Sequence, residues 1–158
     1  MQTTSPTTEH ELVNAGSKTS PAEIVCLVDD DPSVRKSVGR LLESAGFKVR
    51  AFGEPEAFLE HLGNNPVPLV VLDIWMESMT GMELLAHLCA RSPQTRVIFI
   101  TGHGDHAAET TVMSAGAFAF LIKPFDGDHF LSEVHRALRI PLQEKKSDRK
   151  RTSPKPRD

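Results

Sequence analysis

Cysteine and large aromatic side chains are scarce in this 158-residue sequence, which has two cysteines, one tryptophan and no tyrosine. Two cysteines cannot form a framework of disulfides, which favours a reducing compartment such as the cytoplasm. No apolar run approaches the roughly 20 residues of a membrane span. Residues 1–20 lack the apolar centre of a signal peptide. The sequence therefore predicts neither export nor insertion into a membrane.

An overall excess of positive charge is also missing, because 18 Lys and Arg residues face 21 Asp and Glu residues. Residues 21–142 carry a net charge of −6, which argues against a DNA-binding surface on the folded part. Residues 143–158 carry a net charge of +4. We interpret this basic stretch as a solvated tail, with contact to nucleic acid or an acidic partner as the alternative.

The length and composition predict one globular domain between two ends of low complexity. Thr, Ser and Pro dominate the beginning of the sequence, and Lys, Arg and Pro dominate its last 14 residues. We therefore predict a disordered N-terminal segment over residues 1–21, a folded domain over 22–140 and a basic disordered tail over 141–158.

Five short apolar runs in the folded part are typical of β-strands. Four are continuously apolar, which indicates strands covered on both faces, whereas the second alternates with basic residues as a half-exposed edge strand does. The runs occupy residues 24–28, 47–52, 69–72, 97–100 and 117–122.

Helical patterns fill the gaps between these runs. In the first helix, Asp31 is expected to cap the N-terminus and Gly46 to end the helix. In the fourth, Val112 and Met113 are interpreted as core residues, with a partner surface as the alternative. Alternating strands and helices require crossover connections, so we predict an α/β fold with a five-stranded parallel sheet, doubly wound in the order 2-1-3-4-5.

Polar side chains come at the ends of four predicted strands: Asp29, Asp30, Asp73, Thr101 and Lys123. The carboxyl ends of parallel strands share one edge of a sheet, where ligands bind in this class of fold. Three carboxylates in one crevice repel each other, and a hard cation such as Mg²⁺ would neutralise them. This combination of groups is suited to phosphoryl transfer onto a carboxylate. An ion-pair cluster with a purely structural role is the alternative.

These residues belong to a set of motifs that resembles the receiver domain of two-component response regulators, in its FixJ-type form. The resemblance covers about residues 23–138 and implies the flavodoxin-like receiver fold. Its motifs are Val28-Asp29-Asp30-Asp31 with Arg35, Leu72-Asp73 with Gly81, the run from Val97 through Thr101 to Asp105, and Phe120-Leu-Ile-Lys123-Pro124-Phe125.

The resemblance implies a role for each matching residue. Asp73 matches the phosphoacceptor, and Lys123 matches the family's ammonium group, with a cis bond expected between Lys123 and Pro124. Mg²⁺ is expected to be bound by Asp29, Asp30, Asp73 and the backbone carbonyl of Trp75. Thr101 matches the switch hydroxyl and Phe120 the aromatic side chain that is coupled to it.

Three further positions qualify this match. Trp75 and His103 correspond to positions that flank the path of the attacking water, so we expect them to modulate the lifetime of the phosphorylated state. We interpret the other histidines as residues at the surface or supporting the site from behind, with zinc binding or a phosphohistidine as the alternatives. Glu77 occupies a position where the family usually has Pro, which predicts a looser loop and an additional carboxylate near the metal.

The resemblance implies a signalling domain that catalyses only its own phosphorylation and dephosphorylation. We expect a histidine kinase as phosphoryl donor, an output protein whose identity the sequence does not give, and possible pairing into a homodimer through the fourth helix, fifth strand and fifth helix. Too few residues follow Leu138 for a DNA-binding module, which predicts a stand-alone receiver without direct DNA binding. The alternatives are a degenerate receiver that binds partners without phosphorylation, and an Asp-nucleophile phosphohydrolase.

Overall fold

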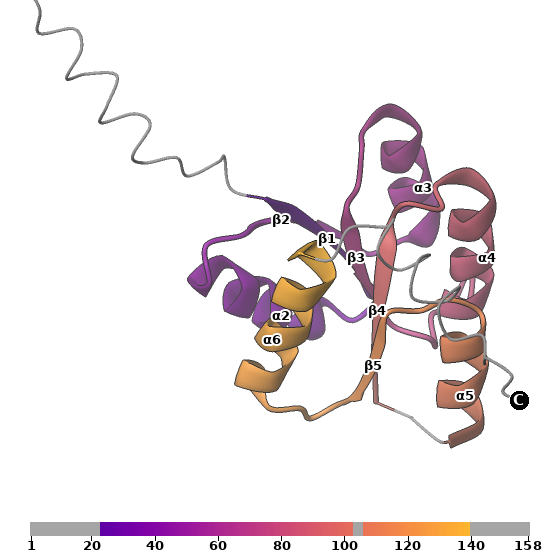
Figure 1. The fold of residues 1–158 in the computed structure, drawn as a ribbon. Helices are drawn as coiled ribbons and strands as arrows, with labels where there is room; N and C mark the ends of the chain where they lie inside the picture. The colour runs from indigo at the N-terminus through magenta and orange to yellow at the C-terminus, as the bar shows by residue number, and fades with distance from the viewer. Residues whose placement is uncertain (1–22, 103–105, 140–158) are drawn as a thin grey trace, which may run out of the picture.

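Strands and helices alternate along the chain in the computed structural model, which describes residues 23–102 and 106–139 (Figure 1). The strands are β1 (Ile24–Val28), β2 (Lys48–Phe52), β3 (Leu69–Leu72), β4 (Arg96–Thr101) and β5 (Ala119–Ile122). The helices are α2 (Pro32–Ser44), α3 (Pro55–Asn64), α4 (Gly81–Arg91), α5 (His106–Ser114) and α6 (Gly127–Arg139). Every predicted strand is present, and the bounds differ from the prediction by two residues at most.

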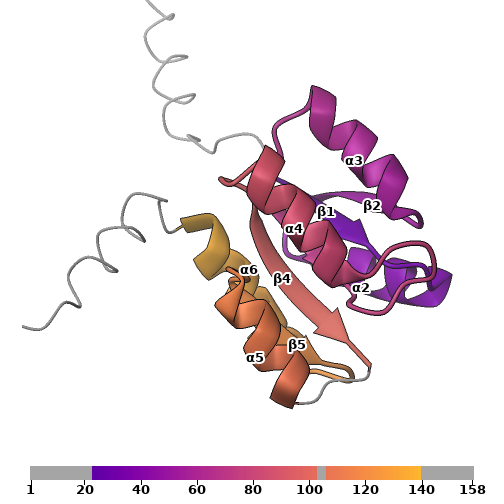
Figure 2. The same ribbon diagram turned by 90° about the vertical axis from the view of Figure 1, so that its right-hand side faces the viewer.

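The five strands form one parallel sheet in the order β2-β1-β3-β4-β5, which confirms the predicted topology. Helices α2 and α6 cover one face of the sheet, and α3, α4 and α5 cover the other (Figures 1 and 2). The register places Val28 of β1 beside Leu72 of β3, so these two strands end at the same level. The residues that follow them are therefore neighbours.

Each face of the sheet has its own hydrophobic core. Phe58 of α3, Leu84 of α4 and Val112 of α5 belong to one core, and Leu42 of α2 and Phe130 of α6 belong to the other. All five side chains are fully buried. Burying such a side chain contributes about 1.5–3 kcal/mol relative to leaving it exposed, so both helical layers are held firmly to the sheet.

The helix ends follow the predicted local chemistry in α2. The Asp31 side chain accepts a hydrogen bond from the Ser33 N–H, as an N-cap does, and Gly46 after the helix has φ of 96°. In α4, Thr80 and Glu83 form a capping box, in which each side chain bonds the other residue's backbone N–H. These caps fix where the loops beside the carboxyl ends of β1 and β3 enter the following helices.

Two exposures differ from the sequence-based interpretation. Met113 of α5 was expected in the core together with Val112, but its exposed fraction is 41%, so that prediction is wrong. Ile122, at the end of the second edge strand β5, is 47% exposed. The helical period of 3.6 explains the first difference, because consecutive residues point about 100° apart and only one of them can face the sheet.

Across the described part of the chain, no helix has the length and apolar character that crossing a bilayer requires.

Candidate functional site

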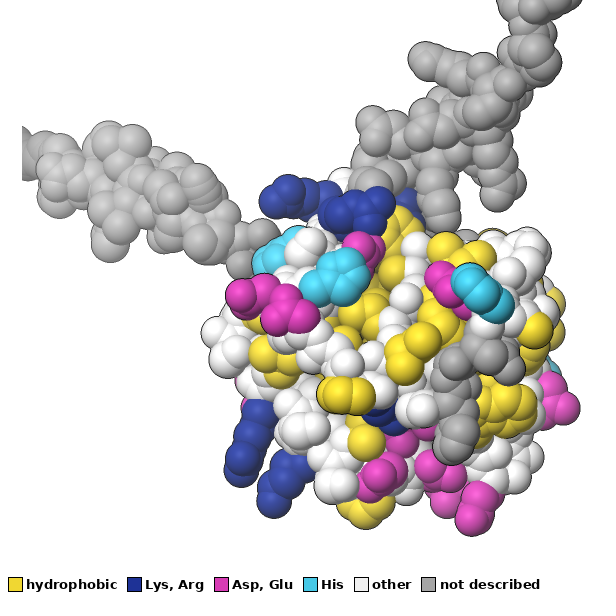
Figure 3. All heavy atoms as spheres, turned by 90° about the horizontal axis from the view of Figure 1, so that it is seen from below, with side chains coloured by type: hydrophobic (Ala, Val, Ile, Leu, Met, Phe, Trp, Pro, Cys, Tyr) yellow, Lys and Arg dark blue, Asp and Glu magenta, His cyan; other side chains and the backbone are white. Residues whose placement is uncertain are grey.

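The ends of four parallel strands bring the predicted site residues to one edge of the sheet. Asp29 follows β1, Asp73 follows β3, Thr101 ends β4 and Lys123 follows β5. Hydrogen bonds extend the sheet ladder to these positions, from the Asp73 N–H to the Val28 carbonyl at 3.2 Å and from the Lys123 N–H to the Thr101 carbonyl at 2.8 Å. Figure 3 views the domain from this edge, where acidic side chains gather beside a recessed basic one.

Lys123 is shared by two carboxylates. Its Nζ atom lies 3.3 Å from Oδ2 of Asp29 and 3.7 Å from Oδ2 of Asp73. At about 4 Å and an effective dielectric near 20, each such pair is worth roughly 4 kcal/mol before desolvation is counted. The ammonium group therefore holds two like charges together. The Lys123–Pro124 peptide bond is cis, which confirms that prediction.

The two carboxylates differ in their exposure to solvent. Asp29 is fully buried, and this burial raises the pKa of its carboxyl group above the ordinary value, although hydrogen bonding by the Asp31 N–H and the charge of Lys123 both lower it. Asp73 retains 8% exposure to solvent, whereas Asp29 has none. Of the two, Asp73 is the one that a reactant from solvent can reach.

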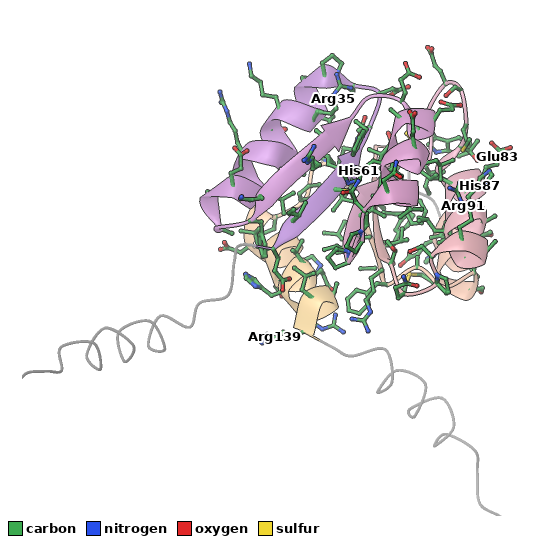
Figure 4. All side chains as sticks on the ribbon, turned by 90° about the horizontal axis from the view of Figure 1, so that it is seen from above. Arg35, His61, Glu83, His87, Arg91 and Arg139 are labelled. Carbon is green, nitrogen blue, oxygen red and sulfur yellow. The ribbon has the colours of Figure 1, made fainter. Side chains whose placement is uncertain are left out.

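Arg35 supports this arrangement from α2 (Figure 4). Its Nη1 atom donates a hydrogen bond of 2.7 Å to the backbone carbonyl of Asp29. Gly53 makes room for the guanidinium, because a Cβ atom at position 53 would lie 2.8 Å from Nη1. The sequence motif included Arg35, but no role was predicted for it, since a bond from a side chain to a backbone carbonyl leaves no signature in the sequence.

The loop after Asp73 is held close to the carboxylate. The Trp75 N–H donates to Oδ1 of Asp73 at 3.2 Å, and the Gly81 N–H donates to the Ile74 carbonyl at 2.7 Å. Gly81 has no space for a side chain, because an added Cβ would overlap the Asp73 carbonyl oxygen. The indole of Trp75 is 54% exposed. The backbone of this loop is therefore well fixed, while its tryptophan side chain lies largely at the surface.

Asp30 does not join the other two carboxylates in contact with Lys123. It is exposed, and its Oδ2 accepts a hydrogen bond of 3.1 Å from the Glu77 N–H in the loop after β3. Within residues 23–102 and 106–139, no three His, Cys, Asp or Glu side chains are grouped so as to hold a metal ion. The structure thus brings Asp29 and Asp73 together as predicted, and directs Asp30 elsewhere.

The chemistry of the donor groups nevertheless fits Mg²⁺. Asp29 and Asp73 already share one cation, the Lys123 ammonium, and Asp30 follows Asp29 directly. These carboxylates and the Trp75 carbonyl form an all-oxygen set, which suits a hard divalent ion that keeps several waters. Asp29, Asp30, Asp73 and the Trp75 carbonyl would be the residues that hold it.

The two residues predicted to form the switch lie on neighbouring strands. Thr101 is fully buried at the end of β4. Phe120 of β5 is half-buried, packs against the core beneath α3, α4 and α5, and pairs in register with Phe99 of β4. His103, the second residue expected to affect lifetime, lies outside the described residues.

Comparison with known proteins gives a consistent result. The family model described as the response regulator receiver domain matches residues 25–135. The transcriptional regulatory protein FixJ of Bradyrhizobium diazoefficiens is 36% identical over 115 residues, covering 73% of this chain and 56% of FixJ. The response regulator protein TmoT of Ectopseudomonas mendocina is 32% identical over 124 residues, covering 78% of this chain and 56% of TmoT. The chain thus spans about half the length of these two relatives.

Solved structures resemble the chain in the same region. The solution structure of the beryllofluoride-activated NtrC4 receiver domain dimer superposes with a TM-score of 0.70 at 30% identity. The superposition covers 73% of this chain and 95% of that one.

Proposed function

This chain belongs to the response regulator receiver family, and from that premise we propose that Asp73 accepts a phosphoryl group from a histidine kinase. The observation that carries the proposal is the position of Lys123 between Asp29 and Asp73. Of these two carboxylates, only Asp73 retains contact with solvent. A buried carboxylate and an ammonium beside the reacting group supply fixed charges at the place where charge develops during transfer.

The proposed reaction is an in-line displacement at phosphorus. A carboxylate oxygen of Asp73 forms the new O–P bond while the bond from phosphorus to the imidazole nitrogen of the kinase histidine breaks, and that imidazole retains the bonding electron pair and takes up a proton. Lys123 stabilises the negative charge on the transferred oxygens. The Thr101 hydroxyl is proposed to donate a hydrogen bond to one of them.

Mg²⁺ is the proposed cofactor, held by Asp29, Asp30, Asp73 and the Trp75 carbonyl. When bound, it neutralises charge on the phosphoryl oxygens and on the carboxylates. The residues of this chain orient the acceptor oxygen, because the Trp75 N–H bonds one oxygen of Asp73 and Lys123 faces the other. Asp29 keeps Lys123 in position for that contact.

We propose that phosphorylation acts through contacts with other proteins. Thr101 is proposed to turn toward the phosphoryl group, with Phe120 moving into the space that this opens, which alters the face formed by α5, β5 and α6. Exposed Met113 and Ile122 on this face support its use as a contact surface between two copies of the chain. We propose that this domain consists of residues 22–140 and works in the cytoplasm.

One alternative has a specific observation in its favour. The bond from the Glu77 N–H to Asp30 takes a proposed metal ligand out of the group, as in a degenerate receiver that binds partners without phosphorylation. A phosphohydrolase is less well supported, because Trp75 stands where such enzymes usually carry a second Asp.

Intact-mass measurement after incubation with acetyl phosphate and Mg²⁺ separates these functions. The proposed receiver gains the mass of one phosphoryl group, and the Asp73→Asn variant does not. Continuous release of inorganic phosphate without a lasting mass increase would identify a hydrolase. An unchanged mass in the wild-type protein would identify the degenerate module and contradict the proposal.

A further inference from the structure

The backbone N–H of Glu77 bonds a carboxylate 47 positions earlier in the chain. It donates to Oδ2 of Asp30 at 3.1 Å, and so joins the loop after β3 to the loop after β1. The neighbouring acids bond differently, because Asp29 accepts from the Asp31 N–H and Asp73 accepts from the Trp75 N–H, each two residues further along. The Glu77–Asp30 bond is therefore a long-range link between these two loops.

This bond opposes the binding of Mg²⁺ by Asp30 at the proposed site. Mg²⁺ requires its ligands in near-ideal octahedral geometry, and the bond from the Glu77 N–H to Oδ2 fixes the orientation of the Asp30 carboxylate, whose Oδ1 keeps its lone pairs. Asp29 and Asp73 face a common cation, whereas Asp30 faces the Glu77 N–H, and the described residues contain no grouping of three such side chains suited to a metal ion. Asp30 must therefore reorient before it can serve as a third carboxylate ligand.

We propose that Glu77 is a positioning residue whose backbone N–H holds Asp30 away from the metal, so that Mg²⁺ binding must first break the Glu77–Asp30 hydrogen bond. The inference rests on the proposed function, because it presupposes Mg²⁺ at Asp29, Asp30 and Asp73. Its consequence is that the metal-free domain is restrained in a state of low Mg²⁺ affinity. Mg²⁺ binding then releases the loop that contains Trp75 and Glu77, and this loop leads into α4.

Two substitutions distinguish the effect of the Glu77 backbone N–H from the effect of the Glu77 carboxylate. Glu77→Ala keeps the N–H and removes the charge, whereas Glu77→Pro removes both. Position 77 lies in an irregular loop, so proline interrupts neither a helix nor a strand. The difference between the two variants therefore reports the hydrogen bond, and the difference between Glu77→Ala and wild type reports the charge.

The test is titration of the metal-free proteins with MgCl₂ in a calorimeter. We expect Glu77→Pro to bind Mg²⁺ roughly three- to tenfold more tightly than Glu77→Ala, because one charge-assisted hydrogen bond no longer competes. Equal affinities would overturn the proposal. Weaker binding by Glu77→Pro would also overturn it, since the N–H would then be orienting Asp30 toward the metal.

A second measurement compares the wild-type protein with Asp30→Ala and does not depend on the folding of a proline variant. In the ¹⁵N–¹H spectrum, Asp30→Ala should move the Glu77 amide proton upfield in the absence of metal, and Mg²⁺ should move the wild-type signal in the same direction. A Glu77 signal that keeps its metal-free position in saturating Mg²⁺ would contradict the proposal that Mg²⁺ binding breaks the Glu77–Asp30 hydrogen bond. If Asp30→Ala leaves Mg²⁺ affinity unchanged, the proposed metal site itself is wrong, which is a distinguishable failure.

Discussion

The Nζ atom of Lys123 lies 3.3 Å from Oδ2 of Asp29, and this contact pairs a partly exposed ammonium group with a fully buried carboxylate. The pair links the loop after β5 to the end of β1, two strands that are not neighbours in the sheet. Asp73, which directly follows β3, the strand between β1 and β4, lies 3.7 Å from the same ammonium group. The Asp73 carboxylate thus shares one ammonium group with a carboxylate at the end of a neighbouring strand.

The raised pKa of Asp29 predicts a pH dependence of stability. A carboxyl group whose pKa is raised by folding contributes stability below its unfolded pKa, near 3.8, and loses that contribution as the pH rises through the folded pKa. Asp29→Asn should therefore gain stability relative to wild type as the pH is raised from 3.5 toward neutrality, both limits being approximate. Urea unfolding across that interval measures it. A constant difference between the two proteins would contradict the prediction.

Gly81 should tolerate no side chain. A Cβ atom there would overlap the Asp73 carbonyl oxygen and lie 2.8 Å from the Phe99 ring, so Gly81→Ala should lower the free energy of unfolding by roughly 2–4 kcal/mol. The matched control is Gly39→Ala within α2, where an added Cβ meets only Val49 at 3.9 Å. That variant should gain roughly 0.5–1 kcal/mol from improved helix propensity. Similar losses in both variants would refute the explanation.

Trp75 is expected to lengthen the life of the phosphorylated state. Its backbone N–H bonds Asp73, and bulk beside a phosphoryl group excludes the attacking water. We expect Trp75→Ala to shorten the lifetime several-fold, measured as decay of the labelled phosphoprotein, and His103→Ala to change it less. The indole is 54% exposed, so shielding depends on its closing over the phosphoryl group.

Tryptophan fluorescence supplies an independent check on this account, because the chain has one tryptophan. The emission should change when Mg²⁺ or beryllofluoride is added. An unaltered lifetime in Trp75→Ala, or a marked lengthening in His103→Ala, would show that shielding by the indole does not control hydrolysis.

Activation should cause association through the face formed by α5, β5 and α6. Met113 and Ile122 expose apolar surface there, at 41% and 47%. We expect light scattering to show a larger mass with beryllofluoride than without it, and Ile122→Lys to abolish the increase because a charge would be buried at the interface. The matched control is Ile24→Lys, an apolar residue of similar exposure (40%) on β1, outside that face. An identical mass and identical amide spectra in both states would refute the prediction.

Much of the fold was predictable because local patterns and tertiary structure agree. Continuous apolar runs placed the strands, and Asp31 and Gly46 placed the ends of α2. The strand order then brought Asp29, Asp73 and Lys123 to one edge of the sheet. For these residues, the residue type and the position along a strand are enough to predict the place in the fold.

The remainder depends on contacts that no local pattern encodes. Met113 has the residue type of a core position, but the side of α5 that faces the sheet is set by packing. The Glu77–Asp30 bond joins two loops through a backbone N–H, which every residue except proline possesses. Carboxylates at a strand end could be predicted to lie near one another, but their individual hydrogen bonds could not.

We propose that Asp73, and neither Asp29 nor Asp30, carries the phosphoryl group. Asp29 is fully buried against Lys123, Asp30 bonds the Glu77 N–H, and Asp73 is held with one oxygen toward Lys123. The most direct test is to phosphorylate the protein with acetyl phosphate and Mg²⁺, reduce the acyl phosphate with borohydride and map the modified residue by peptide mass spectrometry. We expect homoserine at position 73 alone. Homoserine at position 29 or 30, with Asp73 intact, would contradict it.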